Sequence, residues 1–129
     1  MSSGLELLLS GTDASSAARR AIAANDPSLS RTSRDDLELL VTELVTNAVR
    51  HGGATSDRPM RLKLRRRAGR IRVEVLDPGS EFVFSRPANG DSQGGWGLVL
   101  VDRIATRWGV RPLPSGKCVW FELPVEAVL

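Results

Sequence analysis

The fold is decided by residues 60–77, which read MRLKLRRRAGRIRVEVLD. Over 60–66 and again over 70–76, apolar and charged side chains alternate, which is typical of strands with one buried and one solvated face. The apolar positions are Met60, Leu62, Leu64, Ile71, Val73 and Val75. Because the dipeptide Ala68-Gly69 separates the two runs, the stretch predicts a β-hairpin that buries one of its faces.

Two helices are predicted on the N-terminal side of this hairpin. A short apolar run at residues 5–10 predicts an edge strand, and Asp13 or Ser15 then caps a helix that ends before residue 25. Ser33 caps a longer helix over residues 35–50, which ends at the glycines that follow His51. The longer helix has apolar residues at helical spacing: Leu37, Leu40, Val41, Leu44, Val45, Ala48 and Val49.

The C-terminal side of the hairpin predicts a loop, a helix and two strands. Residues 78–96 are polar, rich in glycine and proline, and without periodicity, which is typical of a functional loop. A helix begins at Gly97, its apolar arc extends to Trp108, and two closing strands span 110–113 and 117–123. This order of elements predicts an α+β fold, a two-layer sandwich with three helices on one face of a mixed, mostly antiparallel sheet.

The composition is that of one soluble domain. The chain has 129 residues, 41% hydrophobic and 26% charged, which suits a single domain over residues 1–129. No apolar run approaches the roughly 20 residues of a membrane helix, so no membrane role is expected. The single cysteine, Cys118, excludes an internal disulfide and suits a cytoplasmic location.

Positive charge is concentrated in the hairpin. The formal net charge is +3, yet eight of the fifteen residues 58–72 are Arg or Lys, and the remainder of the chain is mildly acidic. A solvated strand face is the favoured interpretation. A nucleic-acid surface is the alternative, and it is disfavoured because the segment has no aromatic residue for base stacking. That alternative predicts binding that weakens steeply with salt.

A polar stripe borders the apolar arc of the longer helix. Glu43, Asn47 and His51 follow one another at intervals of four residues, and Arg50 lies beside them. A carboxylate and an amide one turn apart can hold a hydrated divalent cation and orient a hydroxyl group. The polar edge of an amphipathic helix explains the same spacing.

Two glycine-containing segments add further candidate groups. Asp77-Pro78-Gly79 ends a predicted strand, where a carboxylate can accept a hydrogen bond from an exocyclic amine and glycine admits a flat ring. The same three residues are equally typical of an ordinary turn that follows a strand. The stretch GGWG at residues 94–97 precedes a helix, where free N–H groups can bind an anion, or it simply ends a flexible loop.

Together and in this order, these segments resemble the GHKL superfamily of ATP-binding proteins. The stretch ELVTNAVRH at residues 43–51 resembles the N box of that superfamily, DPG at 77–79 its G1 box, and GGWGL at 94–98 its G2 box. The closing stretch GKCVWFEL at 116–123 also fits, and the resemblance covers residues 5–124. Among GHKL proteins, the chain most resembles the small anti-sigma-factor serine/threonine kinases.

The resemblance implies a histidine-kinase-like ATPase (Bergerat) fold and a role for each matching position. Glu43 would be the catalytic base, Asn47 would ligate Mg²⁺, and Asp77 would bind the adenine amino group of ATP. The other implied nucleotide-binding positions are Arg50, His51, Gly79, Gly95, Trp96, Gly97, Leu98 and Cys118. Residues 80–96 would form a lid over the phosphates.

Two positions depart from the family pattern. Glu81 stands where the G1 box usually has a second glycine, which predicts weaker closure of the lid. Cys118 stands where relatives often have a threonine near the adenine, and a thiol is a poorer hydrogen-bonding partner.

The resemblance implies an ATP- and Mg²⁺-binding regulatory protein, a serine/threonine kinase that phosphorylates a protein antagonist. The alternative is a non-catalytic ATP-binding module that sequesters its partner. The implied partners are a sigma factor, an anti-anti-sigma-like antagonist, or both, and a homodimer is compatible with the resemblance.

Overall fold

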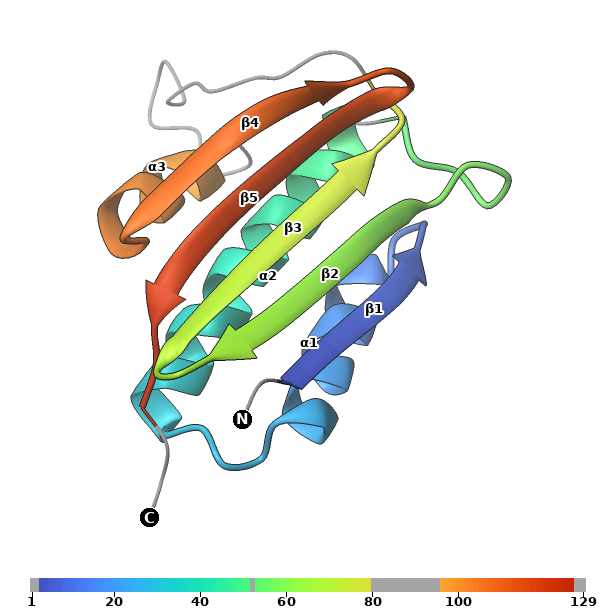
Figure 1. The fold of residues 1–129 in the computed structure, drawn as a ribbon. Coiled ribbons are helices and arrows are strands. Elements are labelled where there is room, and N and C mark those ends of the chain that lie inside the picture. Colours follow the sequence, from blue (N-terminus) through green and yellow to red (C-terminus); the bar gives the residue numbers. More distant parts are fainter. Residues whose placement is uncertain (1–2, 52, 80–95, 127–129) are drawn as a thin grey trace.

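The computed structural model describes residues 3–51, 53–79 and 96–126. Its elements are β1 (Ser3–Leu9), α1 (Ala14–Asn25), α2 (Arg31–His51), β2 (Met60–Arg67), β3 (Arg70–Asp77), α3 (Trp96–Ile104), β4 (Arg107–Leu113) and β5 (Gly116–Pro124). The strands form one five-stranded sheet in the order β1-β2-β3-β5-β4, in which every described pair is antiparallel. The helices lie together behind this sheet (Figure 1). The predicted α+β fold is confirmed.

The hydrophobic core lies between the helices and one face of the sheet. Alternate residues of each strand point toward the helices, as the burial of β3 shows. The fully buried core side chains include Leu37, Leu40, Val41, Val45, Leu62, Ile71, Val73, Val75 and Phe121. Figure 1 views the sheet from its other face, which no described element covers.

The hairpin of β2 and β3 forms as predicted. Arg67 pairs with Arg70, and the two residues between them, Ala68 and Gly69, have φ angles of 37° and 79°. Positive φ at both central residues is the geometry of a type I′ turn, which matches the twist of antiparallel strands. The short apolar run near the N-terminus is also an edge strand, β1, as expected.

The start of α2 differs from the prediction. The helix begins at Arg31, and its first turn is capped by Ser30, whose Oγ accepts a hydrogen bond from the Ser33 amide at 3.2 Å. Ser33, the expected cap, lies inside the helix and is buried. Its hydroxyl instead accepts a hydrogen bond from the Glu126 amide at 2.7 Å, so a contact with the far end of the chain determines its role.

The boundary between α3 and β4 also differs. The helix ends at Ile104, and Trp108, expected on its apolar arc, lies in β4. The chain leaves the helix because the Thr106 amide donates to the Glu122 carbonyl of β5 at 2.9 Å, which begins the pairing of the two strands. The Trp108 indole N–H donates to Asp102 at 2.8 Å and so ties β4 back to α3.

Across the described ranges, no helix is both long and apolar enough to cross a membrane.

Candidate functional site

Residues from α2, β3 and β5 enclose a small cavity beside the end of β3. Its lining is Leu44, Asn47, Ala48, Val75, Asp77, Lys117 and Val119. The cavity measures about 10 Å³, which is close to the minimum for one water molecule. The structure therefore brings together two of the residues singled out in the sequence, Asn47 of α2 and Asp77 of β3.

Asp77 is a buried carboxylate with only one of its two oxygens engaged. The residue is 5% exposed. Its Oδ1 accepts hydrogen bonds from the Lys117 ammonium and from the Gly79 amide, both at 2.9 Å. Its Oδ2 is buried and has no hydrogen-bond partner among the described residues. A buried acceptor without a donor is unfavourable, so this oxygen is a position at which a ligand donor would be stabilised.

Lys117 is the residue of this site that the sequence reasoning missed. It lies directly opposite Asp77 in the β3–β5 register and is 4% exposed. Besides the ion pair with Asp77, its ammonium lies 3.4 Å from the Gly79 carbonyl oxygen, to which it donates. A signal was present: Lys117 has the same parity along β5 as Val119 and Phe121, which belong to the core, so it had to point toward the helices.

Burial raises the pKa of the Asp77 carboxyl, because a low-dielectric environment disfavours its charged form. The hydrogen bond and charge of Lys117, followed by the Gly79 amide, oppose this effect. The carboxylate thus depends on these two donors for its ionised form. A third donor at Oδ2 would add to them.

The backbone of the β4–β5 turn lies unusually close to Asp77. A Cβ on Gly116 would come within 1.9 Å of the Asp77 carbonyl oxygen, so only glycine fits at this position. Gly116 therefore lets β5 approach closely enough for Lys117 to reach the Asp77 carboxylate.

Glu43 lies on α2 one turn before Asn47 and is half-buried. Burial raises the pKa of its carboxyl, and the positive charge of Arg50 opposes that rise. A carboxylate with a raised pKa is a better proton acceptor than an exposed one. Glu43 and Asn47 thus present a carboxylate and an amide on one side of the helix.

The remaining predicted positions of α2 and β3 lie around these groups. Arg50 and His51 are exposed in the last turn of α2. Gly79 is half-buried just after β3, and its amide closes a turn on the Asp77 side chain.

Cys118 does not join these residues. It pairs with Leu76 and Arg111, one position away from the Asp77–Lys117 pair, so its side chain points to the open face of the sheet. Burial, then the charge of Glu74, raises the pKa of its thiol. Cys118, expected beside Asp77, thus lies on the other face of the sheet from that carboxylate, and the β5 residue opposite Asp77 is Lys117.

Several expected positions fall outside the description. Glu81, Gly95 and residues 80–95 of the expected lid are not among the described residues. Trp96, Gly97 and Leu98 form the start of α3, and only their backbone is described.

Within the described ranges, no group of three or more His, Cys, Asp or Glu side chains could hold a metal ion. Of the two predicted site residues of α2 that have side-chain oxygens, Asn47 lines the cavity, and Glu43 lies one turn away on the same helix. This small donor set suits Mg²⁺, which retains several waters and takes further ligands from substrate phosphates.

Comparison with known proteins gives a family match and similarities to solved structures. The family model for the histidine kinase-like ATPase domain matches residues 10–123. The crystal structure of the RsbU and RsbW domains of Rv1364c from Mycobacterium tuberculosis is similar, with a TM-score of 0.71 and 19% identity over 98% of this chain. The present chain covers only 34% of that structure.

A second solved structure is the histidine kinase domain of the blue-light activated histidine kinase from Erythrobacter litoralis EL346. It is 28% identical, with a TM-score of 0.47, over 72% of this chain and 45% of that one. Among curated proteins, no match was found.

Proposed function

The chain belongs to the histidine kinase-like ATPase family, a family of ATP-binding domains, and from this premise we propose that it is an ATP- and Mg²⁺-dependent regulator of a protein partner. The observation that supports a nucleotide site at Asp77 is its buried, unpartnered Oδ2 beside Asn47. An N–H donor from a ligand would satisfy this oxygen.

The hydrogen bonds of Asp77 favour adenine over guanine. Adenine presents one amino group, which needs a single acceptor. Guanine presents two adjacent N–H donors on its Watson–Crick edge. A carboxylate would have to accept one of these hydrogen bonds with each of its two oxygens. Since Oδ1 already accepts from Lys117 and Gly79, only Oδ2 is left, and adenine fits better.

The cavity must widen to admit a base, because about 10 Å³ holds no more than a water molecule. The lysine chain of Lys117 is the flexible part of the lining, and a shift of its ammonium enlarges the space beside Asp77. Nucleotide binding and the Asp77–Lys117 pair are therefore coupled in this proposal.

Asn47 would hold Mg²⁺ through its amide oxygen, with most other ligands coming from phosphates and water. When bound, the ion neutralises charge on the phosphates. Glu43, half-buried one turn away, would orient an attacking hydroxyl and accept its proton. These roles agree with the raised pKa of Glu43, but they are assigned by the family resemblance.

The finer proposal is a serine/threonine kinase that phosphorylates a protein antagonist in the cytoplasm. The resemblance of this sequence to the anti-sigma-factor kinases supports a regulatory partner such as a sigma factor or its antagonist, and the chain shares its fold with a structure that contains an RsbW domain. One feature of the sequence favours a second candidate, a non-catalytic ATP-binding module that sequesters its partner: Glu81 replaces the second glycine of the G1 box.

Calorimetry with ATP, GTP and purine riboside triphosphate, which lacks the 6-amino group, tests the base assignment. We expect ATP to bind most tightly, and Asp77→Asn to remove its advantage over the analogue lacking the amine. Asp35→Asn, an exposed residue at the far end of α2, is the matched control. Equal affinity of the parent protein for ATP and the analogue would place the base elsewhere.

The same titrations with and without Mg²⁺ test the metal assignment. Asn47→Ala should remove most of the Mg²⁺-dependent gain in ATP affinity and leave binding in EDTA nearly unchanged. An unaltered Mg²⁺ dependence would return Asn47 to the role of a polar helix edge.

Catalysis is tested separately by Glu43→Gln, which keeps the shape of the side chain. Loss of a general base lowers the rate by about 10²- to 10⁴-fold. We expect the parent protein to turn over ATP slowly and the Glu43→Gln variant to be slower by that factor, with its ATP affinity little changed. Glu6→Gln, on the opposite face of the sheet, is the control. A parent that binds ATP but neither hydrolyses it nor transfers phosphate to a protein is the sequestering module instead.

A further inference from the structure

The open face of the sheet concentrates the positive charge of the molecule. The register places alternate residues of β2 and β3 on this face, away from the helices. Its cations on these strands are Arg61, Lys63, Arg65, Arg67, Arg70 and Arg72. Its carboxylates are Glu6, Glu74 and Glu122. Since the whole chain has a net charge of only +3, this face is strongly basic relative to the rest.

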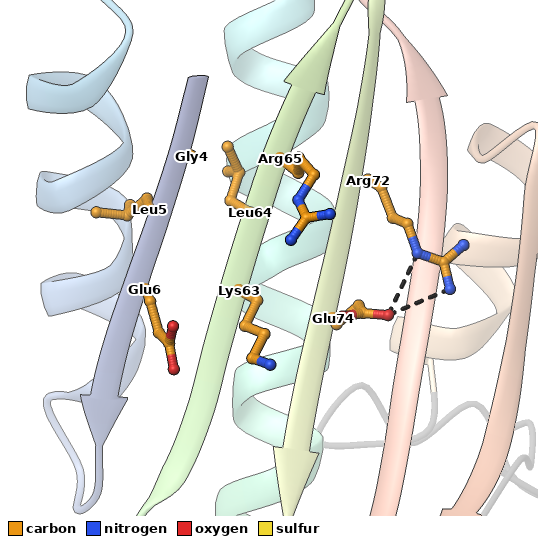
Figure 2. A pocket seen from close by; sticks show the side chains of 8 residues that line it. All are labelled: Gly4, Leu5, Glu6, Lys63, Leu64, Arg65, Arg72 and Glu74. Atoms are coloured by element: carbon orange, nitrogen blue, oxygen red, sulfur yellow. Dashed lines mark hydrogen bonds and ion pairs between the residues drawn. The ribbon is translucent and has the colours of Figure 1, made fainter. Parts of the chain in front are cut away.

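A groove of about 410 Å³ runs over β1, β2 and β3 on this face. Figure 2 shows its lining, with Lys63 and Arg65 on β2 between Glu6 of β1 and Glu74 of β3. Gly4 lies opposite Arg65 in the β1–β2 register, and it has no side chain to cover the guanidinium. The groove is thus a binding-sized hollow whose central side chains are cations.

The cations that line the groove, and Arg61 beside it on β2, differ in how they are paired. Arg72 donates to Glu74 at 3.2 Å and to Glu122 at 3.0 Å, and it stacks on Trp120 with its guanidinium carbon 4.1 Å from the ring centre. Arg61 pairs with Glu6 at 3.2 Å. Among the described residues, Lys63 and Arg65 have no carboxylate within ion-pair distance. Two adjacent cations are therefore left for an external anion.

We propose that this groove binds an acidic segment of a protein partner, whose carboxylates pair with Lys63 and Arg65. Successive open-face cations of β2 stand two residues apart, about 6.7 Å along the strand. Carboxylates one helical turn apart on a partner helix have a similar spacing, about 6 Å. The match identifies an acidic helix as a suitable occupant.

The pattern of charge disfavours nucleic acid. Glu6 and Glu74 flank Lys63 on either side, and these carboxylates would repel a continuous phosphate backbone. Trp120 is half-buried and covered by Arg72, so it is not available for base stacking. A protein segment, in contrast, can place single carboxylates opposite single cations.

The same charge disfavours a second copy of this chain. A two-fold symmetric dimer through the open face would bring two identical cationic surfaces together. Like charges at close approach are repulsive, and the carboxylates of the face are too few to compensate. The groove also lies on the opposite side of the sheet from Asp77, so the proposal stands independently of nucleotide binding.

The test measures binding of a labelled acidic peptide, with glutamate at every fourth residue, by fluorescence anisotropy. The glutamine version of the peptide and an oligothymidine strand are the comparison probes. The principal variant is Lys63→Gln/Arg65→Gln. The matched control, Arg20→Gln/Arg31→Gln, removes two exposed cations from α1 and α2. Thermal melting checks whether each variant is folded. If the double variant is not folded, the single variant Arg65→Gln replaces it.

We expect the acidic peptide to bind the parent and the control equally, and to bind Lys63→Gln/Arg65→Gln at least tenfold more weakly. The glutamine peptide should bind poorly to all three. Equal binding by the groove variant, equal weakening in the control, or no binding by the parent overturns the proposal. Tighter binding of oligothymidine that needs Lys63 and Arg65 reassigns the face to nucleic acid. A parent dimer that the groove variant dissociates, seen by ultracentrifugation, reassigns it to a second copy.

Discussion

At the scale of single residues, the ion pair of Asp77 and Lys117 is the most consequential contact of the molecule. The ammonium and carboxylate are 2.9 Å apart, and their side chains are 5% and 1% exposed. Removing both charges from water is unfavourable, and their mutual attraction and extra hydrogen bonds offset that cost. The pair therefore orients the acceptor of the site more than it stabilises the fold.

The first stability prediction concerns this pair. Lys117→Met should lower the free energy of unfolding by about 3 kcal/mol, because it leaves the Asp77 carboxylate buried without its counter-charge. Asp77→Asn should have a comparable effect. The double variant should be less destabilised than the sum of the two, as measured by urea denaturation. Strict additivity of the two changes would contradict an energetic coupling between these side chains.

At the scale of elements, the β2–β3 turn contains a residue in an unfavourable conformation. Ala68 has a φ of 37°, a region that residues with a Cβ rarely adopt. Its neighbour Gly69 has a φ of 79°, which glycine adopts readily. The twist of the two strands imposes the type I′ turn, and Ala68 bears the strain.

Ala68→Asn should stabilise the protein by about 1 kcal/mol, because asparagine tolerates the left-handed conformation that this turn requires. Ala68→Val at the same position should destabilise it, since a β-branched side chain is disfavoured there. Thermal unfolding of the two variants measures the difference. If both shift the midpoint in the same direction, the turn geometry is not what limits stability.

At the scale of the whole molecule, Glu122 links three strands across the open face. Its Oε1 accepts from the Arg107 Nε of β4 at 2.9 Å, and its Oε2 accepts from Arg72 of β3 at 3.0 Å. The hydrogen bond from Arg107 lowers the pKa of the Glu122 carboxyl, and Arg72 adds to this against the effect of burial. The carboxylate therefore holds β3, β4 and β5 together in its ionised form.

The ion pairs of Glu122 with Arg72 and Arg107 predict how the stability of the fold depends on pH. The folded-state pKa of Glu122 lies below its ordinary value of 4.5. The stabilisation of the fold by the ionised Glu122 carboxylate is therefore fully present above pH 4.5. It is lost as the pH falls through the lowered folded-state pKa. Glu122→Gln should lower the free energy of unfolding by about 2 kcal/mol at neutral pH. It should also make the loss of stability at acid pH less steep.

Glu6→Gln is the control for this prediction, because Glu6 and Arg61 are both about half exposed and such pairs contribute little. Urea denaturation at a series of pH values measures both variants. An acid limb that is as steep in Glu122→Gln as in the parent would show that other carboxyl groups dominate the acid response.

The sequence by itself determined the elements whose patterns are local. The alternation over residues 60–77 predicted the hairpin, its buried face and its basic face, because neighbouring side chains of a strand point to opposite sides. Helical spacing likewise predicted α2, and the order of the three boxes indicated the family. These signals need no knowledge of distant residues.

Only the tertiary structure decided which distant residues meet. Lys117 and Asp77 are 40 residues apart, and the β3–β5 register places them opposite each other. A shift of one residue would have put Cys118 there instead and turned Lys117 to the open face. The role of Ser33 in α2 and the end of α3 depend in the same way on Glu126 and Glu122, which lie just after and within β5. Periodicity predicts that a strand has two faces, but pairing with a remote strand decides which side chain meets which.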